Sequence, residues 1–361
     1  MTVTTPAEAV RPQRRANDVV RSYSELSAVV REAGLLRRTR TFYVTLFSGL
    51  CVGLVGLGVA FALLGDSWFQ LIVAGAFGIL LTQFSFLAHE AAHRQVFASG
   101  PANDRAGRAI ATGIVGISYQ WWMTKHSRHH ANPNKIGKDP DIDMDTISFY
   151  EETAAGQRGW RAALTRHQGS FFFPLLLLEG LNLHVTSGRT LFDRRPVDGR
   201  AQEISTIAVR FALYLTVVFW ALPLGMAFAF LGVQLAVFGV YMGASFAPNH
   251  KGMPIIPADT KLDFFSKQVL TSRNISGGWW ASSLLGGLNY QVEHHLFPSM
   301  PRPHLAKARL LVMEHCRAAG VPYTETTLMR SYGIVVRYLN RVGLAARDPF
   351  DCPMMTQLRP R

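Results

Sequence analysis

The stretch that decides the fold runs from Phe211 to Asn249 and reads FALYLTVVFWALPLGMAFAFLGVQLAVFGVYMGASFAPN, without one charged residue. At 1.5 Å of rise per residue it would form about 58 Å of helix, roughly twice the hydrocarbon thickness of a bilayer. Pro223–Leu224–Gly225 lies near its middle and is the natural place for a turn. We therefore predict a hairpin of two membrane spans, one over about residues 204–222 and one over about residues 225–247.

A second hairpin is predicted nearer the N-terminus. Residues 41–65 and 67–88 carry no charge, and the only charge at their junction is Asp66. Each run is long enough to cross the membrane once. Two hairpins return the chain to the side on which it started. The predicted fold is an all-α membrane protein with four transmembrane helices, two hairpins, interfacial helices and a helical cap on one side.

The composition agrees with this fold. Hydrophobic residues make up 48% of the chain and charged residues only 17%, whereas a soluble domain carries about 25% charged residues. The formal net charge of +13 fits contact with membrane lipid or an acidic protein, and the long uncharged runs argue against a nucleic acid partner. The three cysteines, Cys51, Cys316 and Cys352, lie far apart, so neither a disulfide framework nor a cysteine metal site is predicted.

One further apolar segment, Phe171–Thr186, is expected to lie at the interface or in the protein interior and not to span. It contains Glu179, Asn182 and His184, and charge at bilayer depth is costly. The two predicted hairpin tips lack Lys and Arg while the other segments are basic, which places the cap and both termini in the cytosol.

We divide the chain into a basic cytosolic N-terminal tail (residues 1–40), a membrane domain (residues 41–346) and a C-terminal tail (residues 347–361). The N-terminal tail is expected to be partly ordered, with a short helix around Tyr23–Ala33. The expected location is the cytoplasmic membrane of a bacterium.

Three histidine clusters follow the ends of predicted spans or lie between the hairpins. They read His89–Glu90–Ala91–Ala92–His93, His126–Ser127–Arg128–His129–His130 and Gln291–Val292–Glu293–His294–His295. In a helix, residues three or four positions apart share a face. The first two clusters can therefore each direct several neutral imidazoles to one metal ion.

The residues alone leave alternatives open. The first cluster matches the HExxH pattern of zinc metalloproteases, and histidines without any metal are a further possibility. A catalytic zinc site takes three protein ligands, and this chain offers many more imidazoles than that. Seven or eight imidazoles suit two ions, and imidazole is a ligand for iron, copper, nickel and zinc.

The three clusters, in this order and at these separations, resemble the HxxxH, HxxHH and QxxHH histidine boxes of membrane fatty acid desaturases. The resemblance covers roughly residues 41–310, and the string LNYQVEHHLFP (residues 288–298) is similar to the third box beyond its histidines. The glutamine in the third box resembles the front-end and linoleoyl-type branch. The family implies an oxidoreductase that introduces a cis double bond into a long-chain fatty acyl substrate.

The resemblance also implies the site. It implies a non-haem di-iron centre, two iron ions that use dioxygen and two electrons, on eight histidines: His89, His93, His126, His129, His130, His250, His294 and His295. Gln291, Asn249 and His184 are expected as weak ligands or as hydrogen-bond partners of ligands. Asp141, Asp143 and Asp145 are expected to order the loop after the second box or to form hydrogen bonds with ligand imidazoles.

The substrate is expected to be an acyl-CoA or an acyl-lipid, and the electrons are expected from an external donor such as ferredoxin with its reductase. Lys125, Arg128, Lys135 and Lys138 lie near the second box and can attract an acidic donor. Trp121, Trp122, Trp279 and Trp280 are expected either to line the acyl channel or to anchor the protein at the membrane interface.

Two other functions remain as alternatives. A hydroxylase can use the same scaffold and the same hydrogen abstraction, and the sequence separates it poorly from a desaturase. A non-catalytic membrane metal-binding protein is the more remote alternative, because transporter ligands usually lie near the middle of the membrane and these clusters follow span ends.

Overall fold

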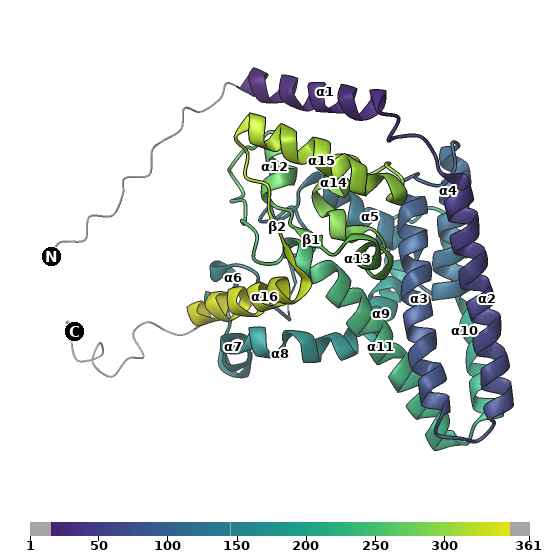
Figure 1. Ribbon diagram of the computed structural model, residues 1–361. Coiled ribbons are helices and arrows are strands. Elements are labelled where there is room, and N and C mark those ends of the chain that lie inside the picture. The colour runs from purple at the N-terminus through teal and green to yellow at the C-terminus, as the bar shows by residue number, and fades with distance from the viewer. Residues whose placement is uncertain (1–15, 145, 347–361) are drawn as a thin grey trace, which may run out of the picture.

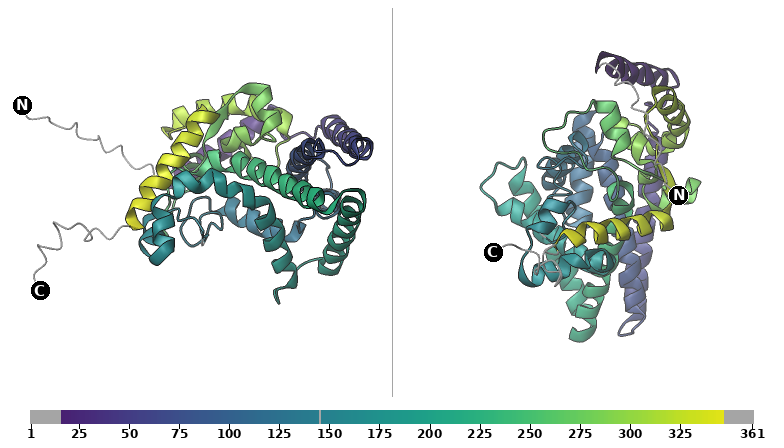
Figure 2. Two further views of the ribbon diagram at one scale, coloured as in Figure 1. Left: turned by 90° about the horizontal axis from the view of Figure 1, so that it is seen from below. Right: turned by 90° about the vertical axis from the view of Figure 1, so that its left-hand side faces the viewer.

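The computed structural model of the protein describes residues 16–144 and 146–346. The predicted C-terminal tail and the first fifteen residues of the predicted N-terminal tail lie outside the described residues. Within the described part, four helices are long and apolar enough to cross a membrane: α2 (Arg40–Leu64), α3 (Gln70–Ala92), α10 (Arg200–Ala221) and α11 (Leu224–His250). They form two hairpins that leave the rest of the molecule in the same direction, as Figure 1 and the right view of Figure 2 show. The predicted number and pairing of spans are confirmed.

The turn of the first hairpin shows how the chain satisfies the backbone groups at the end of a predicted span. The helix α2 stops at Gly65, whose φ of 54° is unfavourable for residues with a side chain. Gln70, fully buried in the first turn of α3, donates its amide to the carbonyls of Phe61 and Gly65 at 2.8 and 2.9 Å. These are the carbonyls that the end of a helix leaves without a partner, so one glutamine closes the turn.

The inner helices α3 and α11 pack closely because of a glycine. A Cβ atom on Gly78 would come within 2.7 Å of the Gln234 carbonyl oxygen on α11. Small residues at such a crossing allow helix backbones to approach in a membrane, where apolar burial alone gives little drive to associate. This contact holds the two hairpins together.

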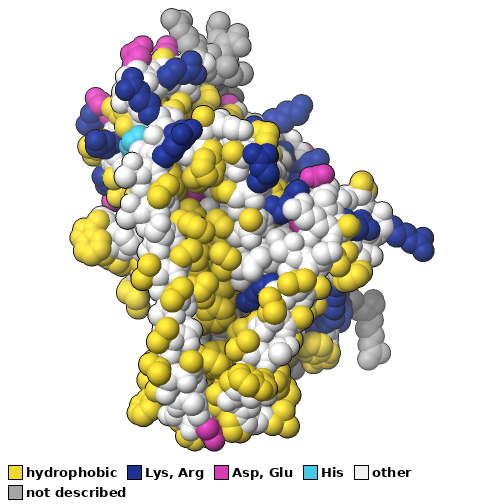
Figure 3. All heavy atoms as spheres, turned by 90° about the vertical axis from the view of Figure 1, so that its right-hand side faces the viewer, with side chains coloured by type: hydrophobic (Ala, Val, Ile, Leu, Met, Phe, Trp, Pro, Cys, Tyr) yellow, Lys and Arg dark blue, Asp and Glu magenta, His cyan; other side chains and the backbone are white. Residues whose placement is uncertain are grey.

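The outer helices α2 and α10 present apolar side chains outward. Val52 on α2 is 72% exposed, and Trp220 at the tip end of α10 is 87% exposed. Figure 3 shows apolar side chains along both hairpins and Lys and Arg gathered toward the cap. Exposed apolar side chains along both hairpins, with the basic residues nearer the cap, fit contact with lipid.

The cap contains the other elements, which lie away from the hairpin tips in Figure 1. Between the hairpins and before them come α1 (Ala16–Glu32), α4 (Gly100–Ile110), the π-helix η1 (Ala111–Val115), α5 (Tyr119–Ala131), α6 (Glu151–Ala155), α7 (Gly159–Arg166), α8 (Gln168–Leu175), the 3₁₀-helix η2 (Leu176–Leu178) and α9 (Glu179–Phe192). After α11 come α12 (Phe264–Leu270), β1 (Asn274–Ser276), α13 (Gly278–Leu284), η3 (Leu288–Tyr290), α14 (Gln291–Leu296), α15 (Arg302–Ala319), β2 (Glu325–Thr327), α16 (Leu328–Gly343) and η4 (Leu344–Ala346). The strands β1 and β2 pair in parallel, with Asn274 opposite Glu325.

The apolar segment Phe171–Thr186 does not form one long helix. It is divided among α8, η2 and α9, and it is not among the four candidate spans. Gly180 on α9 lies against α11 so closely that a Cβ atom there would meet the Leu235 carbonyl oxygen at 2.2 Å. This agrees with the prediction that the segment does not cross.

The N-terminal segment is more ordered than the partly ordered tail that the sequence predicts. Residues 16–32 form α1, and Leu26 and Val30 on it are buried in one cluster with Leu305 and Val312 of α15. The hydroxyl of Tyr23 also donates to the Leu296 carbonyl at 2.9 Å. Leucine and valine four positions apart form an apolar stripe, so α1 belongs to the cap despite its arginines.

Candidate metal centre

Eight histidines from four parts of the chain meet inside the cap. Each histidine of the first group offers a ring nitrogen within 4.8 Å of the others, and the group contains His89, His93, His126, His130 and His294. The second group meets the same limit and contains His129, His250 and His295. The rings of His130 and His295 stack with centroids 4.2 Å apart, so the two groups adjoin. All eight predicted ligands are brought together.

The local structure explains this convergence. The helix α3 continues to Ala92, so His89 and His93 lie one turn apart at its end. The helix α5 begins at Ser118, whose hydroxyl accepts a hydrogen bond from the Trp121 amide, and it carries the second cluster at i, i+3 and i+4. The last two histidines lie on the six-residue helix α14.

The nitrogens of the first group face one another with little else to bind. His126 Nε2 lies 2.9 Å from His89 Nε2 and 2.8 Å from His93 Nε2. Both ring nitrogens of His130 and Nε2 of His294 are buried and have no hydrogen-bond partner among the described residues. Nitrogens that each lie about 2.1 Å from a shared ion, at right angles, would be about 3 Å apart. The spacing and the unpartnered nitrogens therefore fit a metal ion.

The protonation state of these imidazoles also fits. Burial lowers the pKa of His126, His130, His294 and His295 well below the ordinary value for histidine, and neighbouring imidazoles lower it further. These four side chains are therefore neutral at physiological pH, which is the form that binds a metal.

In the second group, each Nδ1 is held by an acceptor outside the group. His129 Nδ1 lies 3.0 Å from a carboxylate oxygen of Asp139, His250 Nδ1 lies 2.8 Å from the Thr271 carbonyl, and His295 Nδ1 lies 2.8 Å from Gln268 Oε1. An acceptor at Nδ1 fixes the proton there and leaves Nε2 free for a metal. Asp139 is not one of the loop aspartates for which the sequence predicted such a bond; of those, Asp141 has a carboxylate oxygen 3.4 Å from His129 Nδ1.

Gln291 and Asn249 lie beside the second group. The Gln291 side-chain amide approaches His250 Nε2 at 2.9 Å, and Asn249 donates to Gln291 Oε1 at 3.0 Å. Both residues are buried. Gln291 is thus positioned at the second group itself, and Asn249 holds Gln291 in place.

His184 is not brought to either group. Its Nδ1 lies 2.6 Å from the Gly180 carbonyl and its Nε2 lies 3.3 Å from the Val115 carbonyl. Both ring nitrogens therefore face backbone oxygens, and the side chain links α9 to η1. This geometry fits a structural histidine better than a ligand.

Glu90 faces away from the histidines, which the sequence did not reveal. Its carboxylate oxygens accept bonds from Arg302 Nε and Nη2 at 2.7 and 2.6 Å, and both residues are buried. The Tyr43 hydroxyl accepts the Arg302 backbone amide and donates to Gln95, whose own amide binds the Pro298 carbonyl. This network joins the first box to the end of the third. In zinc proteases with HExxH the glutamate acts as general base, and Glu90 is engaged elsewhere.

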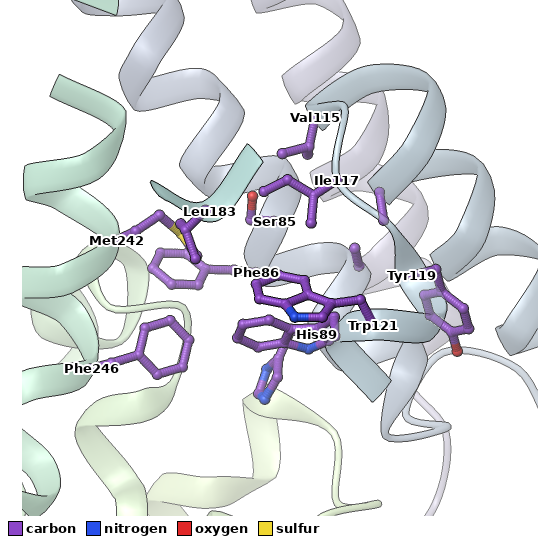
Figure 4. Close-up of a pocket in the computed structure, with 13 residues that line it drawn as sticks. Ser85, Phe86, His89, Val115, Ile117, Tyr119, Trp121, Leu183, Met242 and Phe246 are labelled. Carbon is purple, nitrogen blue, oxygen red and sulfur yellow. The ribbon is translucent and has the colours of Figure 1, made fainter. Parts of the chain in front are cut away.

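Two cavities adjoin the histidines. The first has a volume of about 490 Å³ including its mouth and lies beside His89, and the labelled side chains around it are mostly apolar (Figure 4). The second has a volume of about 1000 Å³ including its mouth, and it reaches His126, His129, His250 and Gln291. Lys125, Asp141, Glu179 and Lys251 also line the second cavity. Both cavities share the side chains Trp122, Leu183, Met242 and Phe246.

The four tryptophans considered above divide into two pairs. Trp121 lines the first cavity and Trp122 lines both, and the Trp122 indole stacks on the His126 imidazole with centroids 5.1 Å apart. Trp279 and Trp280 line neither of these cavities and are 81% and 45% exposed on α13. The first pair fits the lining of a channel, and the second fits an interfacial anchor.

Comparison with known sequences identifies the family. The profile described as "Fatty acid desaturase" matches residues 66–327, a segment that contains all eight histidines of the two groups. The chain belongs to the fatty acid desaturase family. The family predicted from the histidine boxes is therefore confirmed, and with its four apolar helices this desaturase family member is an integral membrane protein.

Named relatives cover most of the chain. The Delta(8)-fatty-acid desaturase 2 of Arabidopsis thaliana is 28% identical over 92% of this chain and 77% of its own length. The Delta(6)-fatty-acid desaturase of Caenorhabditis elegans is 26% identical over 90% of this chain and 75% of its own length. An acyl-lipid (9-3)-desaturase of Borago officinalis is 30% identical over 75% of this chain and 63% of its own length. Relatives of this kind indicate an oxidoreductase that acts on fatty acids.

Proposed function

We propose that this desaturase family member introduces a cis double bond into a long-chain fatty acyl substrate, with dioxygen and two electrons, at two iron ions. The observation that carries the proposal is the convergence of eight histidines where an apolar cavity meets a larger cavity with a charged mouth. The names of the relatives support the reaction class.

The histidines of the first group would hold one iron ion, and those of the second group would hold the other beside Gln291. Neutral imidazole suits iron, and the unpartnered nitrogens fit such ions. When bound, the iron pair supplies the activation of dioxygen that breaking unactivated C–H bonds requires. Asp139, the Thr271 carbonyl and Gln268 fix the protons of the second group on Nδ1, so that each Nε2 presents a lone pair.

The two cavities suggest how the substrate lies. An acyl chain would pass Trp122, Leu183, Met242 and Phe246, the side chains common to both cavities. Its methyl end would enter the apolar cavity beside His89, and its polar head would stay near Lys125 and Lys251. The apolar walls exclude water from the reacting methylenes. The head is carried as acyl-CoA or as an acyl-lipid.

The electron balance requires a donor. Reduction of dioxygen to two water molecules takes four electrons and four protons. The two broken C–H bonds supply two of each, and the other two electrons come from an external carrier while solvent supplies the other two protons. A ferredoxin with its reductase is the donor we propose.

The reaction is tested by the mass of the product. Expression in a host without the activity, followed by mass spectrometry of fatty acid methyl esters, is expected to show a product lighter by two hydrogen atoms and to locate its double bond. Cells with the empty vector are the control. A product heavier by one oxygen atom would identify a hydroxylase. An unchanged profile with metal bound and donor present would favour a non-catalytic metal-binding protein.

We also propose that the histidines and the cap face the cytosol. The hairpin tips carry exposed Trp68 and Trp220 but no Lys or Arg, and the cap is basic. The relatives cited above come from plants and a nematode, so they give no support for the bacterial membrane expected from the sequence.

The orientation can be tested with single cysteines in a background in which Cys51, Cys316 and Cys352 are serine. In intact bacterial host cells, Asp66→Cys at a hairpin tip is expected to react with a membrane-impermeant maleimide. Ser127→Cys, which is exposed on α5, is expected to react only after the cells are permeabilised. The reverse pattern would place the cap outside.

A further inference from the structure

A basic surface lies where the end of α5 meets α12. Its cationic side chains come from the second histidine box, from the loop that follows it and from the segment around α12, and they are Arg128, Lys135, Lys138, Lys261 and Lys267. Two backbone contacts tie these segments together. Lys267 Nζ donates to the Ala131 carbonyl at 2.6 Å, and Lys135 Nζ donates to the Thr260 carbonyl at 2.8 Å.

Few acidic groups offset this charge. Asp259 and Asp263 are the carboxylates within the same α12 segment, and Asp263 caps α12 by accepting the Ser266 amide at 2.9 Å. Lys125, expected from the sequence to belong to this surface, does not. Its Nζ binds Asp141 at 2.8 Å, and its side chain lines the substrate cavity.

A single buried residue, Gln268, lies between this surface and both histidine groups. Gln268 on α12 is fully buried and bridges them, because its Nε2 donates to the His130 carbonyl at 2.8 Å and its Oε1 accepts from His295 Nδ1 at 2.8 Å. Its neighbour Lys267 reaches the surface, as does Ala131, which follows His130 directly. A protein bound here would lie close to the proposed metals, and electron transfer is faster over shorter paths.

The surface combines charge with an apolar centre and lies away from the membrane. Leu262 and Phe264 are 39% and 42% exposed among the lysines, as in interfaces that have apolar and polar parts. Figure 1 shows α12 at the end of the molecule opposite the hairpin tips. Anionic lipid headgroups would more readily meet basic residues beside the spans.

We propose that this surface, defined by Arg128, Lys135, Lys138, Lys261 and Lys267 around Leu262 and Phe264, docks an acidic protein that carries single electrons, of the iron–sulfur class. The proposal rests on the proposed function, because only a reaction that consumes external electrons needs such a partner. Two successive encounters would deliver the two electrons. Weak, electrostatically steered contacts of small area are typical of such partners.

The test uses a triple variant in which the exposed residues Arg128, Lys138 and Lys261 are replaced by glutamate. The purified full-length proteins are assayed in neutral phosphatidylcholine nanodiscs with a [2Fe–2S] ferredoxin and its reductase as the probe. The triple variant is expected to raise the KM for ferredoxin at least about tenfold at low ionic strength, with little change in kcat. Added salt should raise the wild-type KM and leave that of the variant nearly constant.

A matched control carries the same change of charge elsewhere. Arg161→Glu, Arg317→Glu and Arg330→Glu replace exposed arginines on α7, α15 and α16 and should leave the KM for ferredoxin at the wild-type value. An unchanged KM in the test variant, an equal shift in the control, or a wild-type enzyme that takes no electrons from ferredoxin would overturn the proposal. A difference that appears only in nanodiscs with phosphatidylglycerol would assign the surface to anionic lipid instead.

One further measurement separates this proposal from the proposed function. Protein reduced chemically with dithionite, freed of reductant and mixed with substrate and dioxygen, needs no docking partner. Wild type and triple variant should then form equal amounts of product. No product from the wild type would contradict the desaturase function itself, whereas equal product together with an unchanged KM for ferredoxin would contradict only the docking surface.

Discussion

Replacing His126 with alanine is expected to abolish desaturation and to remove metal from the first histidine group. Its Nε2 lies within 2.9 Å of the corresponding nitrogens of both His89 and His93, so one substitution opens the centre of the group. Disturbing a residue that only supports a ligand commonly costs 10- to 100-fold in metal affinity or activity, and loss of a ligand should lower the rate by more than about 100-fold. Product formation and metal content per chain measure the two effects.

His167→Ala is the matched control for His126→Ala. It removes the same imidazole from an exposed position between α7 and α8, so rate and metal content should stay at wild-type values. If His126→Ala kept full activity and full metal content, His126 would not be a ligand and the composition of the first group would be wrong.

Arg302→Met is expected to give the largest loss of stability. It leaves the Glu90 carboxylate buried without its bidentate partner, and breaking a buried ion pair on one side costs about 3–5 kcal/mol. The same substitution removes the side-chain link between the segment after the third box and Glu90 of the first box, while the Arg302 backbone amide can still bind the Tyr43 hydroxyl. The melting temperature of the purified protein in detergent should fall clearly.

Two further variants test how much of the stability loss in Arg302→Met comes from leaving the buried Glu90 carboxylate unpaired. Arg309→Met removes a similar bidentate pair with Glu325, whose side chains are 27% and 25% exposed, and such a pair is worth only about 0–1 kcal/mol. The double variant Glu90→Gln with Arg302→Met removes both charges and should recover part of the stability. A melting temperature for Arg302→Met equal to that of Arg309→Met would show that the ion pair contributes little.

The membrane fold followed from features that a linear sequence carries. Long uncharged runs located the four spans. Because two hairpins return the chain to its starting side, and because the flanking segments are basic, the rest of the chain was predicted to lie on one side of the membrane. The ends were less accurate, because α3 continues to Ala92 and α11 to His250, beyond the uncharged runs. Helical hydrogen bonding continues through a histidine or a glutamate as readily as through a leucine, so charge locates the membrane and not the end of a helix. A short helix was predicted around Tyr23–Ala33, and α1 begins earlier, at Ala16; the packing of its Leu26 and Val30 against α15 was not predicted.

The site could be predicted as far as local spacing reaches. The intervals within each cluster brought the first seven histidines into consideration, and the resemblance added His250. The division into two groups could not be predicted, because it places His129 apart from His126 and His130 although all three lie on α5. The pairing of Glu90 with Arg302 joins residues 212 positions apart. Such contacts are set by the packing of α3 against the start of α15, which no local pattern encodes.

Metal analysis of catalytically active protein tests the central claim most directly. The two histidine groups predict two iron ions per chain in preparations that form the double bond, and His126→Ala should contain fewer. Active protein that contains one metal ion per chain, or zinc in place of iron, would contradict the assignment of eight histidines to a di-iron centre.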